Sequence, residues 1–170
     1  MKTEFGMTLV ELLVTVTLVA ILLVVGLPSY QSITTTNRMA AEMNALVSDL
    51  QYARGEAVKQ GQPVTICASS NGTACSNSTN WANGWLIFSD ANGNRSVNTG
   101  EAVLRIQSAL GSTDTLTSSS LQAVMFNRNG FSSNAGSIKL GDAAGSSDRI
   151  QCVKLSVVGY AQLLSGTNCP

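Results

Sequence analysis

A single carboxylate inside an apolar run is the first residue in this sequence whose chemistry stands out. Glu11 is followed by no other charged residue until Arg38, and residues 12–27 between them are almost wholly apolar. Counted from Met7, this run reaches the roughly 20 residues that an α-helix needs to cross a membrane. A carboxylate is costly to place in lipid, and such a residue by default marks a functional site with a specific partner. We therefore predict a membrane-spanning helix in which Glu11 pairs with another group.

A second set of oxygen-bearing residues lies in the segment 90–101. The oxygen ligands at positions 1, 3, 5 and 12 of this segment would be Asp90, Asn92, Asn94 and Glu101. This spacing is similar to that of a calcium-binding EF-hand loop, although Arg95 stands where such a loop needs glycine and no helices flank it. The alternative is a polar turn closed by hydrogen bonds from Asp and Asn side chains. The pattern leaves a weak calcium site and an ordinary turn both open.

The composition argues against several classes of function. Lys plus Arg and Asp plus Glu number 10 each, so the formal charge is zero, and charged residues are 12% of the chain. A dedicated nucleic-acid-binding protein normally carries a basic excess. The chain has no histidine, which argues against Ser-His-Asp hydrolysis and against histidine-ligated zinc. We expect neither enzymatic activity nor a cofactor.

One long helix is the element that must position Glu11. Beyond Pro28, apolar residues recur at spacings of three and four, the pattern of an amphipathic helix. These residues are Met39, Met43, Leu46, Leu50, Ala53 and Ala57. The charged residues of this segment, Asp49 among them, are expected to lie largely off that stripe. Gly61, with Pro63 two residues later, is a stop signal. We therefore predict a helix over residues 8–60, about 80 Å long at 1.5 Å per residue.

Beyond Pro63, short apolar runs alternate with polar turns, a pattern typical of β-strands. The predicted strands are residues 64–68, 85–89, 103–106, 123–126, 137–140, 150–157 and 160–164. Asn-Gly pairs between them favour tight turns, and the Ser- and Thr-rich residues 111–120 are expected to form a loop. Trp85 lies in an apolar strand and is expected in the core. Trp81 lies among Asn and Ala and is expected to be the more exposed tryptophan.

The residues around Glu11 carry a specific resemblance. After a short polar leader the sequence reads Gly6-Met7-Thr8-Leu9-Val10-Glu11-Leu12-Leu13. This segment closely resembles the class III signal of type IV pilins and pseudopilins, in which a prepilin peptidase cleaves after the glycine and N-methylates the next residue. The resemblance implies a leader of residues 1–6, cleavage after Gly6, methylation of Met7 and an assembly role for Glu11. Pro28 matches the helix-bending proline of the family.

Two later segments narrow the resemblance to one branch of that family. The first, within residues 38–67, reads Leu-Gln-Tyr-Ala-Arg-Gly-Glu-Ala-Val-Lys and then Pro-Val-Thr-Ile-Cys. The second, within residues 84–105, reads Gly-Trp-x-x-Phe-x-Asp-x-Asn-Gly-Asn and then Gly-Glu. Both look like the GspH/FimT branch of minor pilins and pseudopilins. The resemblance implies an α+β fold, in which a long N-terminal helix packs on a two-sheet β domain. The implied parts are a leader (1–6), a transmembrane helix (7–28), an amphipathic helix (29–61) and a globular domain (62–170).

Four cysteines in an exported chain suggest two disulfide bonds, for which three connectivities exist. Cys67 and Cys75 flank a turn-like segment, and Cys152 and Cys169 bracket the last predicted hairpin. We therefore favour the pairs Cys67–Cys75 and Cys152–Cys169. Free buried thiols are the alternative, and a metal site fits these spacings less well.

The resemblance implies a structural role in fibre assembly. The leading function is a minor pilin, held in the inner membrane with a periplasmic C-terminal domain, that joins or primes a type IV pilus near its tip. Its expected partners are other minor and major pilins, prepilin peptidase, the inner-membrane assembly platform and membrane lipid. The alternative machine is the type II secretion pseudopilus.

A DNA-binding minor pilin for natural transformation is a further alternative. Some FimT-like subunits bind DNA through a C-terminal Gly-Arg-x-Arg motif. The matching stretch here, residues 159–162, reads Gly-Tyr-Ala-Gln and lacks both arginines. The remaining candidates for phosphate contacts are Arg128, Lys139, Arg149 and Lys154. Because each lost arginine–phosphate contact weakens binding, DNA ranks below fibre assembly.

Overall fold

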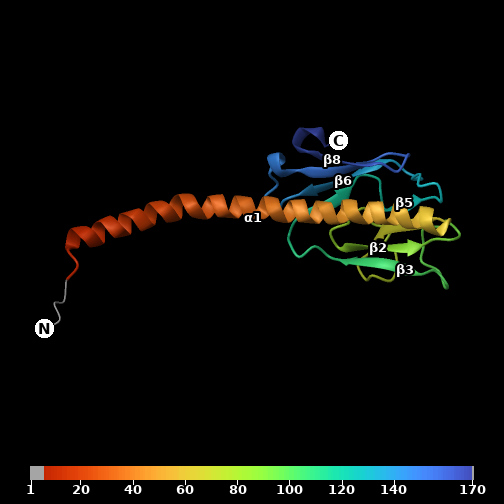
Figure 1. Cartoon of the computed structure of the whole chain (residues 1–170), viewed down its shortest axis with the longest axis horizontal. Coiled ribbons are helices and arrows are strands. Elements are labelled where there is room, and N and C mark those ends of the chain that lie inside the picture. The colour runs from red at the N-terminus through yellow and green to blue at the C-terminus, as the bar shows by residue number, and fades with distance from the viewer. Residues whose placement is uncertain (1–5, 170) are drawn as a thin grey trace. The chain divides into compact units, whose positions relative to one another are not determined.

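The structure, a computed structural model, describes residues 6–169. Residues 1–5, most of the expected leader, lie outside the described residues. The chain divides after Arg38 into two compact units. One helix, α1 (Leu9–Gln60), supplies the first unit and the beginning of the second (Figure 1). The helix expected over residues 8–60 is therefore confirmed to within one residue.

In the first unit, α1 presents its apolar side chains on the surface. Every Leu, Ile and Val between Leu9 and Leu27 is at least half exposed. This helix has a mean hydropathy of 2.7 over 18 residues, none of them buried, and it is the one candidate membrane span among residues 6–169. Exposed apolar surface of this extent is unfavourable in water. The first unit is therefore suited to lipid or to contact with other apolar helices.

The second unit contains two antiparallel four-stranded sheets. The first sheet has the order β3-β2-β1-β5 and the second the order β4-β6-β7-β8. The strands of the first sheet are β1 (Val64–Ala68), β2 (Gly84–Ser89), β3 (Val103–Ser108) and β5 (Ala123–Phe126). Those of the second sheet are β4 (Thr115–Ser118), β6 (Gly136–Gly141), β7 (Gln151–Leu155) and β8 (Ala161–Ser165). Two short 3₁₀ turns, η1 (Ser147–Arg149) and η2 (Gly166–Asn168), precede and follow the last hairpin.

The second half of α1 lies across both sheets, with β2 and β3 to one side of it and β6 and β8 to the other (Figure 1). Its buried apolar residues form one core with residues of both sheets, such as Ile66 and Val153. Full burial of a large apolar side chain contributes about 1.5–3 kcal/mol. Gly61 ends the helix at φ 67°, and its N–H donates to the Ala57 carbonyl over 3.1 Å. This left-handed position is one that glycine adopts without strain.

The outer face of the first sheet has a smaller core of its own. Cys67, Leu86 and Phe88 are fully buried there, with Cys75 and Val97 packed against them. The turn after β1 and the loop after β2 therefore cover this face. That cover explains why every residue of β1 and β2 is buried, whereas a strand with one solvated face shows alternation.

Two expectations about polar segments are wrong. Residues 115–118, expected within a loop, form β4, which pairs with β6. Trp81, expected to be exposed, is fully buried: its backbone N–H donates to the Leu116 carbonyl over 2.7 Å and its Nε1–H to the Leu121 carbonyl over 2.8 Å. The Ser and Thr residues of β4 resemble a loop in composition, but they form a strand in which burial alternates strictly. This strand lies beside Trp81.

Candidate functional site

The start of α1 forms a capped helix end around Glu11. The Glu11 backbone N–H donates to Thr8 Oγ1 over 3.2 Å, and the Leu12 N–H donates to the Thr8 carbonyl over 3.1 Å. Thr8 is therefore the N-cap and Glu11 the third helical residue, the spacing of a capping box. A carboxylate in the first turn also interacts favourably with the positive end of the helix, by about 0.3–1 kcal/mol.

The Glu11 side chain itself is left without a partner by this arrangement. Glu11 is exposed, and among residues 6–169 no hydrogen bond or ion pair satisfies its carboxylate. Its neighbours along α1 are apolar side chains that are also exposed. A buried or lipid-facing carboxylate needs a charge partner. The arrangement can therefore serve as one half of an ion pair completed by another molecule.

Gly6 and Met7 precede the helix, and both are exposed. A Cβ built at Gly6 meets no atom within 4 Å, and its φ is not in the left-handed region. Packing within the described residues therefore gives no reason for glycine at this position. Pro28 lies inside α1, which continues through it, although proline removes one helical N–H donor.

A buried polar network in the second unit holds α1 on the first sheet, and the sequence reasoning missed it. Asp49 is 5% exposed. Its Oδ2 accepts from Trp85 Nε1 over 2.8 Å, and its Oδ1 accepts from Arg105 Nη1 over 2.7 Å. The Arg105 guanidinium also stacks over the Tyr52 ring at 3.9 Å. The sequence spacing does indicate the burial of Asp49, because this residue follows Leu46 by three positions and thus lies on the buried face of the helix.

Near the C-terminal end of α1, the Arg54 side chain contacts two turns whose backbones lie close together at Gly130 and Gly159. Arg54 Nε donates to the Gly130 carbonyl over 2.9 Å. A Cβ at Gly159 would collide with that same carbonyl oxygen, and Gly159 has a φ of 75°. Both the space and the backbone angle therefore require glycine at the start of the stretch 159–162. The structure assigns this glycine a packing role.

The four cysteines form two disulfide bonds, Cys67–Cys75 and Cys152–Cys169. This is the pairing favoured from the sequence. The first bond joins β1 to the turn that follows it, and the second joins β7 to the residue after η2. Both segments are thereby tied to their sheets.

The loop after β2 is organised by the Asp90 carboxylate, which is fully buried. It accepts from Thr65 Oγ1 over 2.7 Å and from the N–H groups of Asn94 and Arg95, each over 3.0 Å. Asn92 also accepts from the Asn94 N–H over 3.0 Å, whereas Glu101 bonds to Asn98. Within residues 6–169, no group of three or more His, Cys, Asp or Glu residues could hold a metal ion. The geometry is that of an Asx turn, and calcium binding stays an untested prediction.

The candidate phosphate contacts do not gather at one place. Lys139 on β6 and Lys154 on β7 share one face of the second sheet, because Lys139 pairs with Cys152, two residues before Lys154. Arg128 is exposed in the turn after β5. Arg149 in η1 forms an ion pair with Asp142 over 3.1 Å. DNA binding through these residues also stays a prediction.

The Asp142 carboxylate, the partner of Arg149, also accepts a backbone hydrogen bond. The donor is the Ser146 N–H, over 2.7 Å. This backbone hydrogen bond, followed by the Arg149 guanidinium, holds the pKa of Asp142 below its ordinary value, although desolvation opposes the shift.

Comparisons with known proteins agree with this geometry. A family model described as type II transport protein GspH matches residues 42–159. One crystal structure of the type IV minor pilin FimU from Pseudomonas aeruginosa is similar with a TM-score of 0.60 and 24% identity, over 83% of this chain and 96% of FimU. A second FimU crystal form gives a TM-score of 0.55 and 26% identity, over 78% and 94%. No curated protein sequence matches the chain.

The fold and the family model point the same way. The long apolar helix and the two-sheet antiparallel β domain are those of the pilin fold shown by the FimU structures. The family model covers more than half of the chain. The chain therefore belongs to the GspH family of minor pilins and pseudopilins.

Proposed function

We propose that this protein is a minor pilin that joins, and helps to prime, a type IV pilus near its tip. Before assembly it is held in the inner membrane by residues 7–28, with the globular domain in the periplasm. Prepilin peptidase cleaves after Gly6 and methylates Met7. The inner-membrane assembly platform then transfers the subunit from lipid to the fibre, where its neighbours are other minor and major pilins.

The observation that carries this proposal is an exposed apolar helix with one unpartnered carboxylate. The apolar side chains of α1 between Leu9 and Leu27 are exposed within the described residues. Either lipid or a bundle of similar helices from other subunits would remove them from water. Glu11 is the exception along this surface, because a carboxylate in lipid is costly unless it has a partner. The favourable interaction with the helix end contributes only about 0.3–1 kcal/mol.

The missing stabilisation points to a partner met only on assembly. Cleavage after Gly6 gives Met7 a new terminal amine four residues before Glu11 in the sequence. The N-terminal ammonium of a neighbouring subunit is a cation that can enter an apolar helix bundle and pair with this carboxylate. Glu11 would then guide docking, because an unpaired charge in the fibre core is penalised.

The pilus is favoured over the type II secretion pseudopilus by the similarity to FimU, which extends over 96% of that minor pilin. The family model bears a secretion description, so the pseudopilus is the alternative. Deleting the gene separates the two machines. The pilus proposal predicts a loss of surface pili with normal export of secreted enzymes, and the reverse result favours the pseudopilus.

Intact-mass measurement on subunits from sheared pili tests the assembly proposal. The expected subunit begins at methylated Met7 and is present in low amounts relative to the major pilin. Subunits that are found in the fibres with Met1 still attached would contradict the proposed processing. Absence of the subunit from both pili and pseudopili would contradict assembly.

A further inference from the structure

Large apolar side chains gather where the C-terminal end of α1 meets two turns of the second unit. A Cβ at Gly130 would stand 3.3 Å from Val58 Cγ2, and a Cβ at Gly159 would collide with the Gly130 carbonyl oxygen. The turn after β5 and the turn between β7 and β8 therefore lie against each other and against the helix. Five side chains here are each about half exposed, from 48% to 58%, and we call them the apolar tip: Val58, Phe131, Val157, Val158 and Tyr160.

The turn between β7 and β8 carries apolar residues where turns usually carry polar ones. The Gly159 N–H donates to the Ser156 carbonyl over 2.9 Å, so Val157 and Val158 are the two central residues of a β-turn. Such positions favour Gly, Pro, Asn, Asp and Ser, whereas valine favours strands. The Val157 carbonyl accepts from the Ser132 N–H over 2.9 Å. The turn is therefore held against its neighbour while both valine side chains remain exposed.

Basic residues accompany the apolar tip. The segments 54–60, 127–131 and 154–160 contain one acidic residue, Glu56, and four basic ones, Arg54, Lys59, Arg128 and Lys154, although the whole chain has no net charge. Glu56 is paired with Lys59 over 3.1 Å. The other three cations have no carboxylate partner among residues 6–169. This end of the second unit therefore combines exposed apolar surface with a positive charge.

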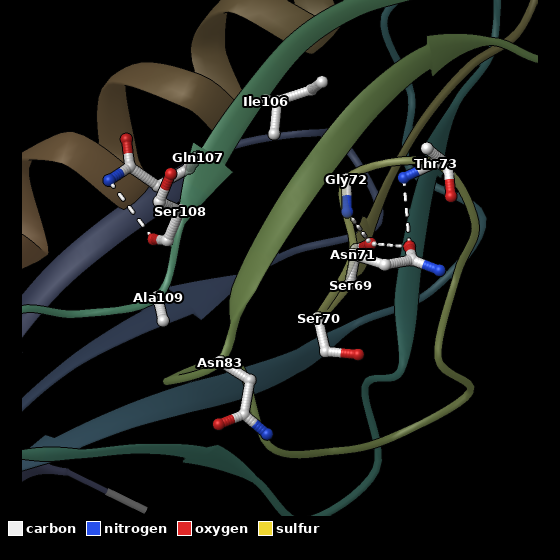
Figure 2. A pocket seen from close by; sticks show the side chains of 10 residues that line it. All are labelled: Ser69, Ser70, Asn71, Gly72, Thr73, Asn83, Ile106, Gln107, Ser108 and Ala109. Atoms are coloured by element: carbon white, nitrogen blue, oxygen red, sulfur yellow. Dashed lines mark hydrogen bonds between the residues drawn. The ribbon is translucent and has the colours of Figure 1, made fainter.

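Ile106 on β3 shows how an isolated exposed apolar residue differs from the apolar tip. It is 55% exposed, as Val58 is. Figure 2 shows it next to Gln107 and Ser108 and near the polar turn 69–73. Single residues of this kind are normal on a protein surface, whereas a contiguous apolar patch marks contact with a protein or a membrane. The apolar tip is such a patch, because three segments bring its side chains to one place.

We propose that the apolar tip binds the surface of a phospholipid bilayer that carries anionic head groups. The two valines at the end of the hairpin enter the boundary between head groups and acyl chains, and Tyr160 lies at the head-group level, where tyrosine is enriched in membrane proteins. Arg128 and Lys154 face the phosphates. Binding of this kind grows with the apolar area that is buried and with the attraction between basic residues and anionic lipid.

Shape, chemistry and charge favour a bilayer over the other occupants. Nucleic acids stack their bases on aromatic rings, but three of the five side chains are valines, which offer neither a planar face nor a hydrogen-bond donor. A folded protein would need a hollow that fits the hairpin end and carries carboxylates beside it. A fluid bilayer adapts to a protruding turn, and its anionic head groups complement cations that have no partner in the chain.

This binding goes beyond the proposed role in fibre assembly, and neither depends on the other. Val58 lies about 30 Å along α1 from Met39, where the chain enters the second unit. The apolar tip also shares no residue with the segment 7–28 that is proposed to be held in the inner membrane. It is therefore a second surface for lipid.

The test uses the full chain in nanodiscs of phosphatidylcholine, whose lipid covers residues 7–28. The discs are mixed with large vesicles made of equal parts of phosphatidylcholine and phosphatidylglycerol, and the vesicles are recovered by flotation. We expect the discs to float with these vesicles and at least about 5-fold less with vesicles of phosphatidylcholine alone. Added salt should weaken the binding, and discs without the chain should not float.

Variants connect the binding to the apolar tip. Val157→Ser together with Val158→Ser should reduce flotation by about 10-fold, and Arg128→Gln by about 5-fold. All three side chains are exposed, so the fold should be retained. Ile106→Ser, which removes an equally exposed apolar side chain elsewhere, is the matched control and should float as the wild type does.

A fluorescence measurement reports insertion directly. Trp81 and Trp85 are fully buried, so a new surface tryptophan reports its own surroundings. Val158→Trp should shift its emission to the blue on anionic vesicles and be quenched by brominated lipid. Ala143→Trp should do neither, because it follows β6, whose other end lies beside the hairpin turn.

Three results would overturn the proposal. The first is the absence of flotation with anionic vesicles, and the second is wild-type flotation of the double serine variant. The third is a different occupant: discs that bind a DNA duplex but not vesicles, or discs that pair with one another through this surface, would assign it to nucleic acid or to a second copy of the chain.

Discussion

Gly6 and Gly26 are two residues that the fold leaves equally free. A Cβ at either position meets no atom within 4 Å, and neither has a left-handed φ. The proposed processing distinguishes them, because the peptidase must accept Gly6 next to the bond that it cleaves. Gly6→Val should therefore accumulate in the membrane as an uncleaved precursor. Gly26→Val should be cleaved as in the wild type. Intact-mass measurement of the membrane fraction decides this, and normal cleavage of Gly6→Val would contradict the assignment.

Asp142 gives a prediction about pH. Its pKa in the folded chain lies below the ordinary value of 3.8, so ionised Asp142 stabilises the folded state. This contribution is fully present above the ordinary pKa and is lost as the pH falls from there through the lowered one. Asp142→Asn should therefore flatten the fall in melting temperature on acidification below about pH 4.

The titration of the Asp142 carboxyl can be followed by NMR. Because the Ser146 N–H is the largest cause of the lowered pKa and Arg149 a smaller one, Arg149→Gln should raise the pKa only part of the way. A complete return to the ordinary value in Arg149→Gln would assign the shift to the ion pair instead. An ordinary pKa in the wild type would contradict the hydrogen-bond account.

Single residues differed in how well their roles could be predicted. Glu11 stands out in the sequence because a charge inside an apolar run is costly without a partner, and its assembly role stays a prediction. Asp49 does not stand out, because it lies among other charged residues and was assigned by type to the solvated face. Its three-residue spacing from Leu46 placed it on the buried face, where Trp85 and Arg105 satisfy it. Long-range partners of this kind are not visible in a local pattern.

At the scale of elements, the Asp49 network fastens α1 to β2 and β3. Asp49→Ala would leave the buried Trp85 N–H without an acceptor, and an unsatisfied buried group costs about 1–3 kcal/mol. We expect the free energy of unfolding of the second unit to fall by about that amount, measured by denaturant titration of the full chain with tryptophan fluorescence. Asp148→Asn, at an exposed carboxylate, is the control and should change it by less than about 0.5 kcal/mol. Equal stability of the two variants would contradict the role of the network.

The β elements show where sequence patterns work and where they fail. β1 and β5 have the predicted bounds because short apolar runs there are bordered by polar turn residues. β4 was missed because its Ser and Thr residues resemble a loop in composition, although they are compatible with strands. Trp81 was expected to be exposed because its neighbours in the sequence are Asn and Ala, whereas its backbone N–H donates to the Leu116 carbonyl on β4. In both cases local composition gave no sign of the contact between segments distant in the sequence.

The whole molecule combines a unit that covers its apolar residues with one that does not. Residues 39–169 bury a core between α1 and two sheets, whereas the apolar side chains of residues 9–27 are all exposed. The second unit has a hydrophobic core of its own and two disulfides. Under the proposed function, lipid and then other subunits would cover the first unit, and Glu11 would favour the second environment over the first.

Incorporation of Glu11 variants into sheared fibres tests the central claim most directly. Glu11→Ala and the isosteric Glu11→Gln should insert into the membrane and retain the fold of residues 39–169, because that carboxylate has no partner among the described residues. Both should nevertheless be depleted from fibres, with Glu11→Asp intermediate because its reach is shorter. Asp148→Asn is the matched control and should assemble normally. Fibres that contain Glu11→Ala subunits at the wild-type level would contradict the claim that this carboxylate pairs with a neighbouring subunit.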